Sequence, residues 1–124
     1  MRTRNTKQKA TIREVFERAE RPLTISDVFD AAAPIVDGLG VATVYRTINA
    51  LLVEGWLQGV EIPGESTRYE RAGKAHHHHF QCDRCARVYD VSGCVRNIAA
   101  LVPPAFRLRD HMVTLYGLCA QCSG

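Results

Sequence analysis

The sequence predicts an α+β protein in which a helical domain precedes a small α/β domain. Apolar residues recur at helical spacing as far as residue 53. Beyond residue 55 they occur in short, strand-like runs bounded by Gly, Pro and Ser. Two Cys-x-x-Cys pairs lie in this second half, where four thiolates can share one metal ion. Helices that precede the strands, rather than alternate with them, indicate the α+β class.

A chain of 124 residues fits one ordinary domain or two small ones. Charged residues or Gly interrupt its apolar stretches every few residues, and its basic N-terminus lacks the apolar region of a secretory signal. We therefore expect a cytoplasmic protein with no membrane partner. In that reducing compartment, five cysteines favour metal ligation over a disulfide framework.

Positive charge is concentrated at the start of the chain. Residues 1–21 hold seven basic side chains against three acidic ones, whereas the net charge of the whole chain is only +3. A basic end on a nearly neutral body is typical of a protein that binds a polyanion. A solvated, charged helix face explains the same pattern equally well.

Capping residues and apolar spacing predict the first two helices. Thr6 is the expected N-cap of a helix that ends near residue 19. Thr24 with Asp27 three residues later forms a capping-box pattern that begins the second helix. The residues expected to face the core are Ala10, Val15, Phe16 and Ala19 in the first helix, and Val28 and Ala32 in the second.

The third helix, in "VATVYRTINALLVEG", has a core face and a polar face. Thr43, Tyr45 and Arg46 lie outside the core face, in the first turns of the helix. Such a helix suits the major groove of DNA, because Arg can address guanine while the others reach phosphates or a thymine methyl. The core face is predicted to hold Val44, Ile48, Leu51 and Leu52.

Two strand-like runs follow, "GWLQGVEI" and "TRYER", joined by the turn sequence "PGES". Three helices and a two-stranded hairpin, in that order, predict a winged helix-turn-helix domain. The alternative is a generic three-helix domain in which Tyr45 and Arg46 are surface residues only.

The two Cys-x-x-Cys pairs predict a tetrahedral zinc site, because each pair can direct two thiolates at one centre. We call these four residues the tetracysteine set: Cys82, Cys85, Cys119 and Cys122. A thioredoxin-type redox role is the competing interpretation. It requires one pair at the start of a helix in a βαβ unit, and both pairs here end strand-like segments.

Four consecutive histidines precede the first pair, in "HHHHFQC". In a strand, His76 and His78 point to one face and His77 and His79 to the other. The first face can be completed by Cys94 and His111, giving three imidazoles and one thiolate, a combination that favours zinc over harder metals. We call His76, His78, Cys94 and His111 the first histidine set. The alternatives are a solvated polar face and an inert buried thiol.

The opposite face can draw on Glu70 for an oxygen-containing site, with Glu61 and Glu65 as further candidates. We call Glu70, His77 and His79 the second histidine set. A solvated polar face is again the alternative. No His-x-Glu and no His-Glu-x-x-His pattern is present, so the sequence predicts neither a zinc enzyme nor a small organic substrate.

The sequence resembles the ferric uptake regulator (Fur) family of metal-responsive repressors. The matching segments are "TKQKATI", "GLGVATVYRTINALLVEGWL", "RYE", "HHHHFQCDRC", "HMVTLYGLC" and "CAQC". The resemblance implies a winged-helix domain over residues 1–72 and an α/β dimerisation domain over residues 73–124. It also implies a homodimer that binds AT-rich palindromic operator DNA when the sensory metal is present.

The resemblance assigns roles to individual residues. It implies that the tetracysteine set holds structural Zn²⁺, that His76, His78 and His111 are sensory ligands, and that Cys94 stands where many members have Glu. It implies hinge ligands in the second histidine set. The residues matched to DNA contacts are Tyr45 and Arg46, with Thr43 beside them and Arg4, Lys7 and Lys9 in the basic N-terminal arm.

Two departures leave the second histidine set incomplete. Iron-sensing members have a histidine at the start of the second helix, where this chain has Pro22. One zinc-sensing branch has a cysteine and an Asp where this chain has Ala72 and Gln58. The fourth ligand of that set is therefore open.

These observations lead to the hypothesis of a metal-dependent, DNA-binding transcriptional repressor that controls zinc-homeostasis genes, most like the zinc uptake regulator branch. Its regulatory ion would be Zn²⁺, with Fe²⁺ or Mn²⁺ in an iron- or other-metal-sensing member as the first alternative. A zinc-buffering protein without operator binding, or a thiol oxidoreductase, are alternatives of another class.

Overall fold

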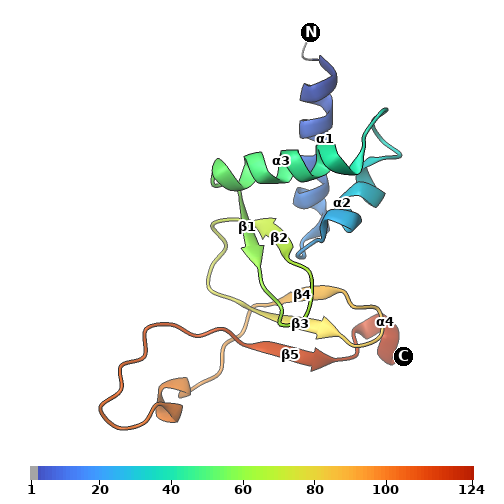
Figure 1. The fold of residues 1–124 in the computed structure, drawn as a ribbon. Coiled ribbons are helices and arrows are strands. Elements are labelled where there is room, and N and C mark those ends of the chain that lie inside the picture. Colours follow the sequence, from blue (N-terminus) through green and yellow to red (C-terminus); the bar gives the residue numbers. More distant parts are fainter. Residues whose placement is uncertain (1–2) are drawn as a thin grey trace. The chain divides into compact units, whose positions relative to one another are not determined.

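A computed structural model describes residues 3–124, with side chains described from Asn5 onward. The chain divides into two compact units, Met1–Lys74 and Ala75–Gly124 (Figure 1). The first unit has helices and a two-stranded hairpin, and the second has a three-stranded sheet, so the predicted α+β class is confirmed. Over the described residues, no helix is both long and apolar enough to span a membrane.

The helices of the first unit span Thr3–Ala19 (α1), Ile25–Ala32 (α2) and Val41–Val53 (α3). The predicted capping box begins α2: the Thr24 hydroxyl accepts the N–H of Asp27 at 3.0 Å, and the Asp27 carboxylate accepts the N–H of Thr24 at 3.0 Å. The predicted start of α1 was wrong. Thr6 lies inside the helix, because no Gly or Pro interrupts the residues before it.

A hydrophobic core joins the three helices to the hairpin. On α3 the predicted core face is confirmed, with Leu52 only partly buried. On α1 the prediction is confirmed for Phe16, which is buried, and for Val15 and Ala19, which are partly buried against the core. It was wrong for Ala10, which is exposed, and it missed Ile12, which is fully buried. The buried members of this core are Ile12, Phe16, Leu23, Val28, Ala32, Leu39, Val44, Ile48, Leu51 and Leu57.

The hairpin forms as predicted from strands Leu57–Val60 (β1) and Arg68–Arg71 (β2), which pair antiparallel with Gln58 opposite Glu70. Gly55 adopts a φ of +81°, which only glycine reaches without strain, and ends α3 just before β1. The backbone of Leu23 exchanges two hydrogen bonds with Tyr69, at 2.9 and 2.8 Å. The wing is thereby fixed to the segment between α1 and α2.

The second unit is built on strand His78–Cys82 (β3). It lies between Val88–Val91 (β4), to which it is antiparallel, and Thr114–Gly117 (β5), to which it is parallel. A 3-10 turn at Ile98–Leu101 (η1) and a single helical turn at Ala120–Ser123 (α4) complete the unit. The apolar or cysteine side chains buried here, among those described, are Cys82, Val88 and Cys119.

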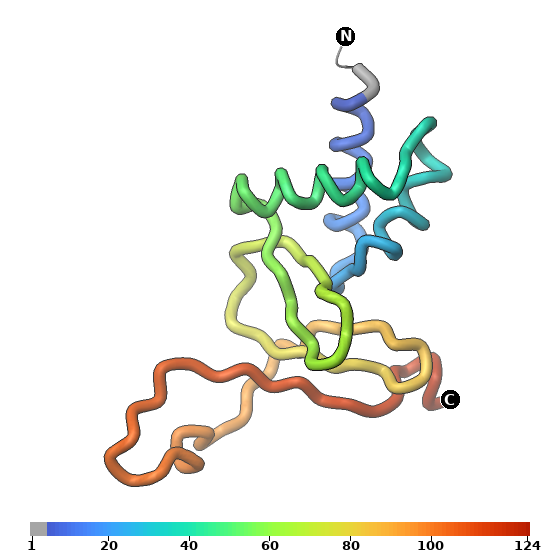
Figure 2. Tube along the Cα trace, in the orientation of Figure 1, coloured from blue at the N-terminus to red at the C-terminus, as the bar shows by residue number. Residues whose placement is uncertain are grey.

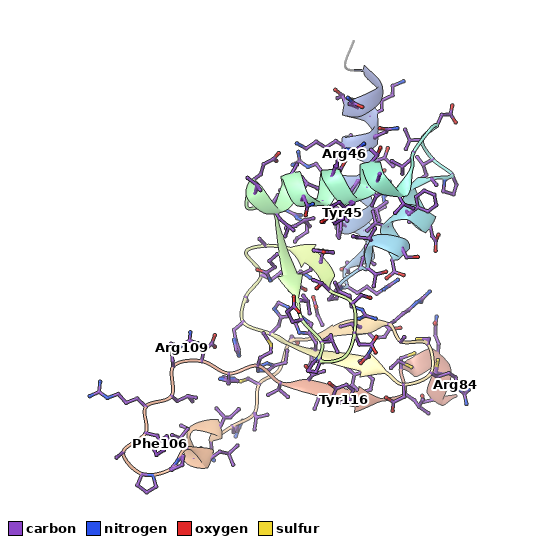
Figure 3. The ribbon with its side chains drawn as sticks, viewed as in Figure 1. Tyr45, Arg46, Arg84, Phe106, Arg109 and Tyr116 are labelled. Atoms are coloured by element: carbon purple, nitrogen blue, oxygen red, sulfur yellow. The ribbon has the colours of Figure 1, made fainter. Side chains whose placement is uncertain are left out.

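Between β4 and β5 the chain leaves the sheet over residues 92–113 and then returns to it (Figure 2). This excursion exposes several large apolar side chains, including Phe106, which Figure 3 labels far from the strands. They are Val95, Leu101, Phe106, Leu108 and Met112. No strand forms within the excursion, so it is joined to the sheet only through its two ends, which continue from β4 and into β5.

We expect Ile48→Ala to lower the free energy of unfolding of the first unit by about 2–5 kcal/mol, because Ile48 is fully buried and its loss leaves a cavity. Val53→Ala, on the same helix but 89% exposed, should change it by less than about 0.5 kcal/mol. Urea denaturation followed by the fluorescence of Trp56, the single tryptophan, measures both. Equal effects of the two substitutions would contradict the core described above.

Candidate metal centres and nucleic-acid interface

The tetracysteine set converges at one end of the sheet. Cys82 ends β3 and Cys85 lies in the turn that follows, whereas Cys119 and Cys122 lie at the start and inside of α4. The four sulfurs all lie within 4.8 Å of one another, and those of Cys85 and Cys119 are 3.8 Å apart. Thiolates bound to one tetrahedral zinc at about 2.3 Å are separated by about 3.8 Å, so the set fits that ion.

The turn between Cys82 and Cys85 is closed by the backbone. Ala86 adopts a φ of +65°, and its N–H donates to the carbonyl of Cys82 at 3.0 Å. The Cys82 sulfur accepts the backbone N–H groups of Cys85 and Cys119, each at 3.4 Å. Residues 37 positions apart are thus joined at one sulfur.

The backbone N–H groups of Cys85 and Cys119 lower the pKa of Cys82 to about 6, so this residue is a thiolate near neutral pH. Hydrogen bonding to the Cys119 sulfur, together with burial, raises the pKa of Cys122 to about 12. The set therefore combines one thiol that loses its proton near neutral pH, Cys82, with one that keeps it, Cys122. A divalent cation would replace retained protons, which couples metal binding to pH.

The first histidine set converges on the side of the sheet opposite to His77 and His79. The Nε2 atom of His76 lies 3.2 Å from those of His78 and His111. The Cys94 sulfur lies 3.1 Å from Nε2 of His111, 3.4 Å from that of His78 and 3.7 Å from that of His76. A tetrahedral zinc would separate two ligand nitrogens by about 3.3 Å and nitrogen from sulfur by about 3.5 Å. All four predicted residues are brought together in an arrangement that fits one ion.

His78 differs from the other members of this set. It is buried, and burial followed by the charge on His76 lowers its pKa, so the ring is neutral. Its Nδ1 accepts the backbone N–H of Val113 at 3.1 Å, which orients the ring toward the other ligands. A neutral ring that accepts at Nδ1 carries its proton on Nε2. Coordination of a metal through Nε2 would therefore require the proton to move to Nδ1 and the Val113 contact to be lost, at a cost of about 1 kcal/mol.

On the other face of β3, His77 and His79 meet Asp90 of β4. Each histidine Nε2 lies 3.6 Å from Oδ1 of Asp90, and the two imidazole centroids are 4.9 Å apart. Sequence reasoning missed Asp90. The available signal was its place in "VYDV", because the antiparallel register sets Asp90 directly opposite His79. Asp90 therefore offers a carboxylate oxygen beside His77 and His79. The sequence analysis had found carboxylates for this face only in the wing hairpin.

The wing carboxylates proposed for this set lie in the first unit. Glu70 is buried in β2, where it accepts hydrogen bonds from Gln58 at 2.8 Å and from Lys74 at 3.5 Å. Glu61 accepts the Thr67 hydroxyl at 3.2 Å, and Glu65 pairs with Arg68 at 3.7 Å. The assignment of Glu70 as a ligand stays a prediction.

Of the residues predicted to read DNA from α3, Tyr45 and Arg46 are exposed and Thr43 is partly exposed. Tyr45 and Arg46 project from α3 (Figure 3), and a guanidinium nitrogen of Arg46 donates to the Thr43 hydroxyl at 3.3 Å. A hollow of about 270 Å³ runs between α1 and α3, lined by Asn5, Gln8, Lys9, Thr43, Arg46, Thr47 and Ala50. Polar and cationic groups thus surround the first turns of α3.

The basic arm is only partly available to a polyanion. Lys7 is exposed on α1, whereas the ammonium of Lys9 lies 2.7 Å from the Glu54 carboxylate. Phosphate would have to compete with that carboxylate for Lys9. The backbone of Arg4 belongs to α1, and its side chain lies outside the described part of the chain.

The sequence model of the ferric uptake regulator family matches residues 1–116. The chain belongs to this family. Fur regulators bind operator DNA and dimerise, and they are not enzymes, which confirms the predicted class and excludes a thiol oxidoreductase. The protein is accordingly a metal-dependent transcriptional regulator of the Fur family.

The proteins that this Fur protein resembles are named after different metals. It is 28% identical over 123 residues to the ferric uptake regulation protein of Bacillus subtilis, across 94% of this chain and 83% of that protein. It is 32% identical over 88 residues to that of Campylobacter jejuni, across 68% of this chain and 56%, just over half, of the relative. A zinc-bound manganese uptake regulator shares the fold, with a TM-score of 0.76 and 24% identity over 90% of this chain and 87% of that one. These likenesses do not favour the zinc branch over the others.

We expect Cys122→Ser to remove one bound metal ion and to unfold the second unit of this Fur protein while the first unit stays folded. The reason is that the hydrophobic core lies wholly in the first unit, whereas few apolar side chains are buried in the second. Hydrogen exchange followed by mass spectrometry reports amide protection separately in α3 and β3.

Cys94→Ser is the matched control, since it removes a cysteine outside the tetracysteine set and should leave β3 protected. Full protection of β3 in Cys122→Ser would show that the sheet does not depend on that set.

Proposed function

We propose that this Fur protein is a repressor of zinc-homeostasis genes, with structural Zn²⁺ in the tetracysteine set and regulatory Zn²⁺ in the first histidine set. The observation that carries the proposal is the convergence of three imidazole nitrogens and the Cys94 sulfur, at separations of 3.1–3.7 Å. The tetracysteine set is sufficient for a structural ion, so the first histidine set is available for a regulatory one.

The chemistry of Cys94 supports zinc as the regulatory ion. A thiolate with imidazoles is a borderline-soft donor set, and Fe²⁺ and Mn²⁺ are held more readily by sets that contain carboxylates. No carboxylate belongs to the four residues of the first histidine set. Cys94 is also exposed, so the site can exchange its ion with solvent.

The second histidine set is the better candidate for a harder ion. His77, His79 and Asp90 offer two nitrogens and one oxygen, and Glu70 would add a second oxygen. A metal bound by Glu70 as well would link the winged-helix unit to the sheet, and would give DNA affinity a second dependence on metal, in addition to that of the zinc sensor. His77 and His79 are thus proposed as ligands distinct from those of the zinc sensor.

The proposed partner is operator DNA with an AT-rich dyad, bound by a homodimer in the cytoplasm. Tyr45, Arg46 and Thr43 would enter the major groove, and Lys7, Lys9 and Arg4 would contact the phosphate backbone. Two recognition helices in a dimer would read two half-sites of one duplex. A zinc buffer without operator binding is the alternative, and the following experiment distinguishes the two.

We expect zinc-loaded protein to enrich a dyad-containing duplex from a randomised library. Arg46→Ala should weaken binding to that duplex about 5- to 150-fold per half-site, because a bidentate contact to a base contributes about 1–3 kcal/mol. Fluorescence anisotropy of the labelled duplex measures the affinity. Arg18→Ala is the control, since it removes the same charge from the far end of α1, where Arg18 is exposed and pairs with Glu14. Failure of the zinc-loaded chain to enrich any sequence would favour the buffering protein.

We expect Cys94→Ser to abolish the preference for zinc over Mn²⁺ and Fe²⁺ in metal-dependent DNA binding, because the hydroxyl replaces the only soft donor of the first histidine set. The measurement is competition among the three ions, read out by operator affinity. In Co²⁺-substituted protein the thiolate absorption should fall but persist, since the tetracysteine set is intact. Unchanged metal selectivity in Cys94→Ser would remove the support for zinc sensing.

A further inference from the structure

We propose that Val41, the first residue of α3, contacts the 5-methyl group of a thymine in the major groove and so determines part of the operator specificity. This inference rests on the proposed function and adds a base-reading residue that the family resemblance did not supply. The side chain of Val41 is apolar, and the fold leaves it exposed to solvent.

Val41 is 56% exposed, although α3 has a well-formed core face. Val44 and Ile48 occupy that face and are fully buried. Val41 instead shares a strip with Tyr45, which is four residues along the helix and 53% exposed. The first turns of α3 therefore present one aliphatic and one aromatic side chain outward, side by side.

The electrostatic setting of this strip suits DNA. The first turn of α3 contains no acidic side chain, and Gly40, its N-cap, makes no side-chain capping bond. The N-terminal end of the helix thus keeps its partial positive charge, which favours an anionic partner. Arg46 lies one residue beyond Tyr45 and adds a full positive charge. A protein partner of this surface would have to match an apolar strip beside a positive charge, whereas duplex DNA offers apolar thymine methyl groups and anionic phosphates together.

Within the major groove, one group matches an aliphatic side chain. Thymine presents its C5 methyl there, and the other base edges present hydrogen-bond donors and acceptors. The N-terminal residues of a recognition helix are those that reach base edges. Val41 has that position and no polar atom on its side chain, so the geometry and chemistry select a thymine methyl.

The experiment uses zinc-loaded, full-length protein and the duplex that it enriches from a randomised library. Each thymine of that duplex is replaced in turn by deoxyuridine, which lacks only the methyl group. At one thymine per half-site, we expect the replacement to weaken wild-type binding about fourfold, the value of one buried methyl-sized group. For Val41→Ala the same replacement should change the affinity by less than about twofold.

Val53→Ala is the matched control, because it makes the same substitution at an exposed position at the other end of α3. It should keep the full wild-type sensitivity to deoxyuridine. Far-UV circular dichroism checks that both variants remain folded, and Ala is a better helix former than Val at either position.

Two outcomes would overturn the assignment while leaving the proposed function intact: sequence-specific binding that no deoxyuridine weakens, or equal sensitivity in wild type and Val41→Ala. A change in the oligomeric state of Val41→Ala without a change in that sensitivity would overturn it in favour of a protein contact. Absence of sequence-specific binding by the zinc-loaded wild type would overturn the proposed function, and this assignment with it.

Discussion

The second unit has convergent sulfur and nitrogen atoms where the first unit has apolar packing. The first unit buries a cluster of aliphatic and aromatic side chains among its helices and hairpin. The three strands of the second unit bury mainly cysteine and histidine, with Val88 as the fully buried aliphatic residue among those described. The Cys82 sulfur joins the turn after β3 to the start of α4. Because the core of this sheet is so small, we expect its stability to depend on a bound metal ion.

The position of β3 explains how one short strand serves separate clusters. It is the central strand, so its backbone is paired on both edges and its side chains alone are available for ligation. Strict alternation sends His78 to one face and His77 with His79 to the other. Strand β4 contributes Asp90 to one cluster, and the chain beyond it contributes Cys94 to the other. A shift of register by one residue would exchange these assignments and break both clusters.

Local sequence patterns were sufficient for much of this fold. The capping box of α2, the core face of α3, the hairpin and the two Cys-x-x-Cys pairs each depend on residues close in the chain, and the structure has them as expected. The errors have a different origin. Burial of Ile12 rather than Ala10 depends on how α1 packs against the other helices, and the place of Asp90 depends on pairing between strands. The contact between Val113 and the His78 ring joins residues 35 positions apart and leaves no local pattern to detect.

The two ends of the excursion between β4 and β5 meet at Cys94 and His111, whose ligand atoms are 3.1 Å apart. Residues 95–110 therefore form a loop that is closed at its base by the cluster itself. For a flexible loop, doubling the length raises the free energy of closure by only about 0.6 kcal/mol. This part of the chain can accordingly gain or lose residues during evolution at little energetic cost, provided that the two ligands at its base are kept. New binding surfaces can arise there without any change to the first histidine set.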